Sequence, residues 1–221
     1  MCGRYVLAVD PETLQTAFNL SSTPDFPPRF NIAPTQHNPV ITNEAPASAV
    51  LMRWGLIPSW SKDTKIGASL INARSESAAE KPSFRNALRR RRCLIPASGF
   101  YEWQQRDGGK APMYIHLADA PVFAMAGLWE VWKDPATGEI IRTYSILTTD
   151  ANPFMQSIHH RMPVILQPED YAAWLATEEV SIDAVRHLMR PFDGGALAAH
   201  EVSKAVNRPV NDSPDLIEPV A

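Results

Sequence analysis

The sequence lacks several features that define common classes of protein. Cysteine occurs only twice among 221 residues, at Cys2 and Cys93, so no disulfide framework is predicted and a reducing compartment is expected. No apolar run is long enough to span a bilayer. The N-terminus also lacks the charged-then-apolar layout of a signal peptide. These absences predict a cytoplasmic protein without membrane contact.

Common catalytic and cofactor signatures are missing as well. The sequence contains no Walker loop, no nucleophile-elbow motif and no Rossmann glycine pattern. His159 and His160 are adjacent and therefore point in different directions, and no second Cys/His pair stands at ligand spacing. We therefore expect neither a metal nor an organic cofactor. The net charge of −3 argues against a wholly basic nucleic-acid-binding protein but leaves room for a local basic face.

The residues that are present describe an ordinary globular chain. A hydrophobic fraction of 45% and a length of 221 residues suffice for a full core, in one large domain or two small ones. The 20 prolines are scattered, which predicts many fixed turns instead of one linker.

Local patterns predict strands in the middle of the chain and helices on either side. Caps at Asp10, Asn152 and Ser181 predict helix starts. Residues 30–34 are interpreted as an apolar turn, and residues 202–210 as a late strand or an extended segment. The predicted strands of the middle region are 93–96, 99–104, 113–117, 122–132 and 140–148. This arrangement predicts an α+β fold in a single domain.

Cys2 follows the initiator methionine directly. Removal of Met1 would leave a free α-amine beside the thiol, which is a 1,2-aminothiol. Such a group condenses with an aldehyde through its amine and closes a thiazolidine through its sulfur; alternatively, its thiol could attack a carbonyl with the amine as base. A small residue at a frayed chain end is the simpler interpretation, and position alone favours it.

Three further polar residues stand in apolar surroundings. Glu102 lies between two aromatic residues of a predicted strand, where it is either solvent-facing or held in a pocket that tunes its pKa. His159 follows a predicted short helix, and a histidine there caps carbonyls at least as often as it catalyses. Asn72 could simply bond a loop backbone.

Basic and aromatic residues gather in one part of the chain. Residues 74–92 contain seven Lys or Arg and two Glu, including Arg74 and the run 89–92. Arginines interleaved with aromatic residues such as Trp60 and Trp103 are typical of single-stranded nucleic-acid binding, where bases stack and phosphates pair. A solvated charge run and core tryptophans are the alternative interpretations.

Six short motifs in order give the chain a family resemblance, which a closing Val202-Ser203 and Val206-Asn207 extend over essentially its whole length. The chain resembles the SOS-response-associated peptidase (SRAP) family. The motifs are Met1-Cys2-Gly3-Arg4-Tyr5, Phe30-Asn31-Ile32-Ala33-Pro34, Trp54-Gly55-Leu56-Ile57-Pro58, Ile71-Asn72-Ala73-Arg74-Ser75-Glu76, Gly99-Phe100-Tyr101-Glu102-Trp103 and His159-His160-Arg161-Met162-Pro163.

The resemblance implies a single SRAP domain over residues 1–221. It implies an antiparallel β-barrel-like core, flanked by helices, with a positively charged cleft. It also implies removal of Met1 and covalent capture of abasic sites in single-stranded DNA by Cys2, as part of the response to DNA damage, with weak lyase and autopeptidase activity. We expect a monomer.

The resemblance also implies site residues. Some relatives carry two consecutive tryptophans where this chain has Trp60-Ser61, so the second stacking contact is in question. The implied catalytic positions are Cys2, Asn72, Glu102 and His159, and the implied DNA-contact positions are Arg4, Asn31, Pro34, Trp60, Arg74, Trp103 and Arg161.

Two other functions stay open at this point. The Met-Cys-Gly start also opens N-terminal-nucleophile amidotransferases that hydrolyse glutamine, although their downstream glutamine-gripping and oxyanion motifs are not found. A non-catalytic module that binds single strands through Arg74 and the tryptophans is the third possibility.

Overall fold

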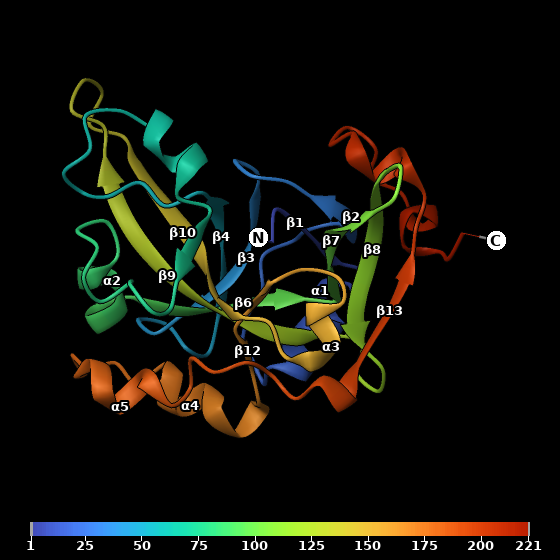
Figure 1. The fold of residues 1–221 in the computed structure, drawn as a ribbon. Coiled ribbons are helices and arrows are strands. Elements are labelled where there is room, and N and C mark those ends of the chain that lie inside the picture. The colour runs from blue at the N-terminus through green and yellow to red at the C-terminus, as the bar shows by residue number, and fades with distance from the viewer. Residues whose placement is uncertain (1, 221) are drawn as a thin grey trace.

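A small closed barrel dominates the computed structural model, which describes residues 2–220 (Figure 1). Its strands, in pairing order, are β10 (Ile140–Asp150), β4 (Ala49–Trp54), β3 (His37–Thr42), β6 (Arg92–Ala97) and β9 (Phe123–Lys133). The barrel closes because β10 pairs with both β4 and β9. Three short strands extend it, namely β5 (Asn72–Arg74) and β11 (Arg161–Pro163) beside β10, and β12 (Ile165–Leu166) beside β9.

A second, five-stranded sheet contains the start of the chain. All its neighbouring strands are antiparallel. Their order is β13 (Leu197–Glu201), β8 (Gly109–Leu117), β7 (Gly99–Arg106), β1 (Arg4–Leu7) and β2 (Arg29–Ile32). The barrel and this sheet pack together, because one hydrophobic cluster contains buried residues from both. The two sheets therefore form a single domain.

Aromatic side chains carry the contact between β1 and the barrel. The Tyr5 ring packs edge-on against Trp54 with 5.2 Å between centroids, and its hydroxyl lies 2.7 Å from the hydroxyl of Tyr144. All three side chains are fully buried. Buried hydroxyls need hydrogen-bond partners, so this pair fixes β1 against β10 in both position and orientation.

The helices are short and lie on the outside, and α4 and α5 run along one edge of the barrel (Figure 1). They are α1 (Pro11–Ala17), α2 (Arg85–Arg90), α3 (Pro153–Gln156), α4 (Tyr171–Trp174) and α5 (Ile182–Arg186). The predicted caps are confirmed, since the side chains of Asp10, Asn152 and Ser181 each accept a hydrogen bond from a backbone N–H of the first turn. No helix within residues 2–220 has the length and hydropathy needed to cross a membrane.

The strand predictions for residues 93–148 are confirmed, but other expectations are wrong. The core is mixed instead of antiparallel, because the chain crosses over between strands and brings both β4 and β5 parallel to β10. It is also mostly β, with only short peripheral helices.

Residues 30–34 and 202–210 also differ from expectation. Phe30 to Ile32 belong to strand β2 instead of a turn, because they pair with β1. The late strand lies earlier, at Leu197–Glu201, and Lys204–Asn207 form a 3₁₀ turn, η4, that buries Val206. The other 3₁₀ turns are η1 (Lys65–Ser69), η2 (Pro168–Asp170), η3 (Gly194–Ala196) and η5 (Pro214–Ile217).

The arginine run 89–92 does not form one basic face. Arg89 and Arg90 both pair with Glu179, and Arg91 pairs with Glu130. Arg92 is fully buried and donates hydrogen bonds to five backbone carbonyls, those of Leu88, Arg89, Trp174, Ala176 and Glu178. Its guanidinium therefore joins the end of α2 to the segment after α4.

Replacing Arg92 with methionine tests this structural role. The substitution leaves buried carbonyls without donors, so we expect the free energy of unfolding to fall by about 3 kcal/mol. Arg90→Met is the matched control, because that exposed side chain contributes within about 1 kcal/mol through its surface ion pair. Urea denaturation of both variants measures the difference, and equal midpoints would refute the role of Arg92.

Candidate active site

Cys2 is buried between the barrel and the second sheet. The antiparallel register of β1 and β7 pairs Arg4 with Tyr101, and its continuation brings residues 3 and 2 beside Glu102 and Trp103. From the other side, the Asn72 amide donates a 2.8 Å hydrogen bond from Nδ2 to the Cys2 carbonyl. The Cys2 side chain is fully buried, with Sγ 3.7 Å from the carbonyl of Arg4. The chain start is therefore an ordered part of the core and not a frayed end.

Burial governs the titration of the Cys2 thiol. Loss of solvent raises its pKa far above the usual range, and the nearby charge of Glu102 raises the pKa further. A thiol in this environment stays protonated at neutral pH. It becomes a nucleophile only when a neighbouring group accepts its proton.

Glu102 is the carboxylate closest to this chemistry. It stands on β7 and is 3% exposed, and burial raises its pKa above the usual range of a glutamate. A carboxyl group with a raised pKa can both accept and return a proton near neutral pH.

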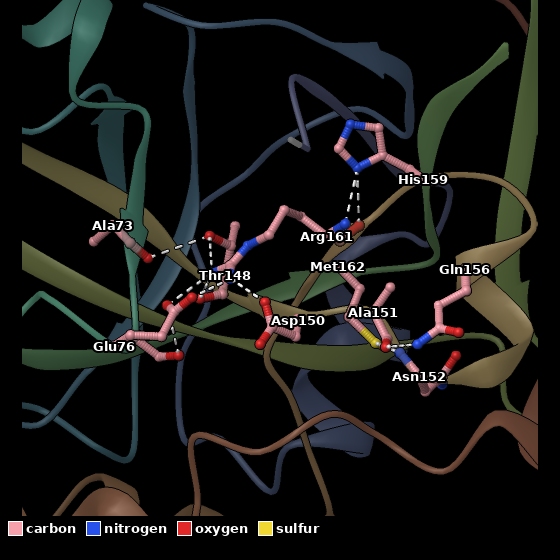
Figure 2. Close-up of polar contacts among 11 residues, drawn as sticks. Ala73, Glu76, Thr148, Asp150, Ala151, Asn152, Gln156, His159, Arg161 and Met162 are labelled. Carbon is pink, nitrogen blue, oxygen red and sulfur yellow. Dashed lines mark hydrogen bonds and ion pairs between the residues drawn. The ribbon is translucent and has the colours of Figure 1, made fainter.

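His159 lies on the other side of Glu102, just before β11. Its Nδ1 is 4.0 Å from Glu102 Oε1 and accepts a 3.0 Å hydrogen bond from the backbone N–H of Arg161 (Figure 2). The same Nδ1 lies 3.2 Å from the Arg161 carbonyl, so the contacts of the ring accommodate either neutral tautomer. Burial lowers the pKa of His159, which favours the neutral imidazole.

Strand β5 holds two more of the predicted residues. Its parallel pairing with β10 places Asn72 opposite Ile146 and Arg74 opposite Thr148. Asn72 Oδ1 is buried and has no hydrogen-bond partner among residues 2–220, so this acceptor is available next to Cys2. Arg74 is exposed and forms no salt bridge within the described part of the chain.

Arg161, predicted to contact DNA, is buried in a network of protein groups. Its guanidinium pairs with both carboxylate oxygens of Glu76 and with Asp150 Oδ1 at 2.7 Å, and donates to the Thr148 carbonyl at 2.8 Å (Figure 2). The side chain is 6% exposed. Arg161 thereby links two strands of the site. It joins β11, which follows His159, to Glu76, which lies just after the strand β5 that carries Asn72 and Arg74.

The C-terminal segment 206–211 engages three other predicted DNA-contact residues. Arg4 donates to the side chain of Asn31 and to the carbonyl of Val206, both at 2.9 Å. The Asn31 amide donates to three carbonyls of that segment. Trp103 Nε1 donates a 2.7 Å hydrogen bond to Asn207 Oδ1. The half-buried Arg4 and Trp103 side chains are thus fixed by residues from the far end of the chain.

Trp60 and Pro34 complete the predicted set. Trp60 is 59% exposed on the loop between β4 and β5. A hydrogen bond from the Leu56 N–H to the Leu70 carbonyl closes the base of this loop. Pro34 is half-buried in the turn after β2.

The structure therefore brings Cys2, Asn72, Glu102 and His159 together, although they come from four separate segments. It also reveals Glu76, Asp150 and Asn207 as residues that hold predicted site residues in place. Glu76 belongs to a quoted motif, but it meets Arg161 across 85 residues of sequence, so no local spacing indicates the pair. Within residues 2–220, no cluster of three or more His, Cys, Asp or Glu side chains is arranged to hold a metal.

Comparisons with solved structures agree with this fold. A crystal structure of a protein from Bacteroides thetaiotaomicron superposes with a TM-score of 0.91 at 29% identity, covering 100% of both chains. One from Bordetella bronchiseptica gives a TM-score of 0.79, also at 29% identity, covering 91% of this chain and 100% of that one.

Sequence comparisons identify the family. The chain is 43% identical over 223 residues to the abasic site processing protein YoqW of Bacillus subtilis, covering 99% of each. It is 35% identical over 225 residues to the abasic site processing protein HMCES of Gallus gallus, covering 87% of this chain and 66% of that one. The family model for SOS response associated peptidase (SRAP) matches residues 1–209. The chain therefore belongs to the SRAP family.

Proposed function

We propose that this protein captures abasic sites in single-stranded DNA by forming a covalent bond through Cys2 after Met1 has been removed. The observation that carries the proposal is the cluster of Asn72, Glu102 and His159 around a buried residue 2. The relatives' names support it, because each is called an abasic site processing protein.

The order of the chemical steps follows from the environment of Cys2. A ring-opened abasic site presents an aldehyde at C1′. Since burial keeps the thiol protonated, the neutral α-amine attacks first and forms a carbinolamine. Loss of water gives an iminium ion. The sulfur then bonds to C1′ as the thiol proton leaves, which closes a thiazolidine without any oxidant or cofactor.

Each neighbouring group has a distinct role in these steps. Glu102 accepts a proton from the attacking amine and later from the thiol, which its raised pKa allows near neutral pH. His159, which lies 4.0 Å from Glu102, serves as the acid for the departing sugar or carbinolamine oxygen. Asn72 orients residue 2 without titrating. If the iminium persists, β-elimination cleaves the strand, so weak lyase activity accompanies capture.

The predicted DNA contacts divide into two groups. Arg74 and Trp60 are exposed and suit phosphate pairing and base stacking. Arg4, Asn31, Trp103 and Arg161 are held by protein groups, so they shape the surface that the strand contacts. Arg161 would meet a phosphate only as a member of the network with Glu76 and Asp150.

Cys2→Ala tests the covalent step. After Met1 removal this variant keeps an N-terminal amine but has no sulfur, so it should form an iminium that borohydride traps. It should give no adduct that survives heating. A denaturing gel with abasic single-stranded DNA measures both products, and intact mass confirms that each preparation begins at residue 2. A heat-stable adduct at the wild-type level would exclude the thiazolidine.

Glu102→Gln tests proton transfer. The capture rate should fall by about 10²–10⁴-fold, because a general acid–base group is lost. In the wild type, the rate should fall with decreasing pH both through protonation of the α-amine and through the raised pKa of Glu102, and the variant should lose only the Glu102 contribution. Single-turnover rates across pH measure the effect. An unchanged acidic limb in the variant would assign the titration to another group.

Arg74→Ala tests the grip on DNA. Loss of one phosphate contact should weaken binding of single strands of any sequence and reduce the slope of log K against log salt by about 0.7. Fluorescence anisotropy at several salt concentrations measures the slope. Arg186→Ala is the control, because that exposed arginine is on α5 and pairs with Asp183. Identical slopes for wild type and Arg74→Ala would show that the DNA strand binds elsewhere on the protein.

A further inference from the structure

The barrel wall carries a basic pocket that the proposed chemistry does not use. It is a hollow of about 560 Å³ lined by His37, Leu51, Arg53, Thr64, Glu139, Ile140, Ile141 and Arg142. The strand register pairs His37 on β3 with Arg53 on β4, and Arg53 pairs in turn with Thr143 on β10, the residue next to Arg142. We call this hollow the wall pocket.

The two arginines of the wall pocket have no carboxylate partner among residues 2–220. Neither Arg53 nor Arg142 forms a salt bridge within residues 2–220, although Glu139 lines the same hollow. Arg53 Nη1 is buried without a hydrogen-bond partner. By contrast, the buried Arg92 donates from its guanidinium to several carbonyls and leaves no nitrogen unpaired within residues 2–220, whereas Arg161 has several acceptors but its Nε is unpaired there.

An unsatisfied buried guanidinium N–H is rare and costly, so it points to an acceptor that binds there. Arg142 also lines the pocket, and its guanidinium lies 5.9 Å from the centroid of the buried Trp129 ring, outside the pocket lining. Two arginines and a histidine form a donor set that suits a phosphate.

The position of the wall pocket relates it to the candidate active site. Thr64 belongs to the loop that carries Trp60, so that loop forms one wall of the pocket. Along β10, Arg142 precedes Ile146, the partner of Asn72, by four residues, which corresponds to about 13 Å of strand. A short stretch of extended DNA could therefore reach from one site to the other.

Apolar side chains flank the cations. Leu51 is 45% exposed and Ile140 is 64% exposed, which is unusual for large hydrophobic residues in this chain. Charged donors beside apolar surface match a nucleotide, whose phosphate pairs while its sugar and base pack.

We propose that the wall pocket binds a backbone phosphate of the DNA strand that flanks the captured nucleotide. This proposal rests on the proposed function, since it extends the same strand beyond the reacting sugar. On this proposal the wall pocket contributes to the affinity for DNA, and it lies away from Cys2, where the covalent bonds to the abasic site form.

The test compares two DNA lengths in an Arg53→Gln/Arg142→Gln double variant. With a 21-nucleotide strand carrying a central abasic site, we expect about tenfold weaker binding and a salt slope smaller by about 1.4, for two lost phosphate contacts. With a three-nucleotide strand carrying the same central abasic site, whose single flanking nucleotides are too short to reach the pocket, affinity should be unchanged. The cross-linking rate at saturating DNA should equal that of the wild type with both strands.

Two further variants sharpen the result. Arg186→Gln/Arg190→Gln removes two exposed arginines from the region of α5 and should leave both affinities unchanged. Arg142→Gln alone removes one exposed cation without leaving a buried gap. It should give about half of the change in salt slope, even if the double variant does not fold.

The outcomes separate this proposal from the proposed function. If wild-type protein captures abasic DNA but the wall-pocket variants bind the long strand normally, the pocket proposal is wrong and the capture chemistry stands. If wild-type protein captures neither strand, the proposed function itself fails. Inorganic phosphate that shifts the amide signals of Arg53 in the wild type, together with normal long-strand binding by the variants, would identify a free-anion site instead and overturn the proposal.

Discussion

The structure depends on how the first strand is held between the two sheets. The backbone ladder of β1 with β7, continued to the chain start, brings residues 2 and 3 beside Trp103 and Glu102, and the hydroxyl pair of Tyr5 and Tyr144 fixes the depth of β1 against the barrel. Neither contact alone fixes a chain end in three dimensions. Together they convert a position that is usually mobile into one with a defined neighbourhood, which is what a terminal reactive group needs.

Arginine serves two separate purposes in this chain. Arg4, Arg92 and Arg161 hold segments together by donating to carbonyls or carboxylates, and these residues contribute order more than surface charge. Arg53, Arg74 and Arg142 form no salt bridge within residues 2–220 and lie apart from that framework. The net charge of −3 is therefore a poor guide to binding, since the charges that matter are the few that the fold leaves unneutralised.

Local sequence patterns predicted the positions of helices and strands well, but they did not predict how the strands pair. The caps at Asp10, Asn152 and Ser181 act within a few residues, so their signals are contained in the sequence itself. Closure of the barrel depends on β10 pairing with β4, which precedes it by about 90 residues, and no local pattern encodes that choice. The strand β2 was missed for the same reason, because only its partner β1 makes it a strand.

The candidate site shows the same limit. Its residues were placed by family motifs, and nothing in the spacing of Asn72, Glu102 and His159 indicates that they converge. The roles of Glu76 and Asn207 in holding Arg161 and Trp103 were missed, because these partners lie 85 and 104 positions away in the sequence.

The contact between Arg4 and the segment 206–211 bears on how the protein is made. Val206 follows Arg4 by 202 residues, so a ribosome synthesises most of the chain before this contact can form. During that interval the chain start is outside the exit tunnel but not yet enclosed by its final neighbours. An aminopeptidase acting on the nascent chain would therefore meet Met1 before the surface around Arg4 and Trp103 is complete. The late arrival of the segment 206–211 would thus leave time for the proposed removal of Met1.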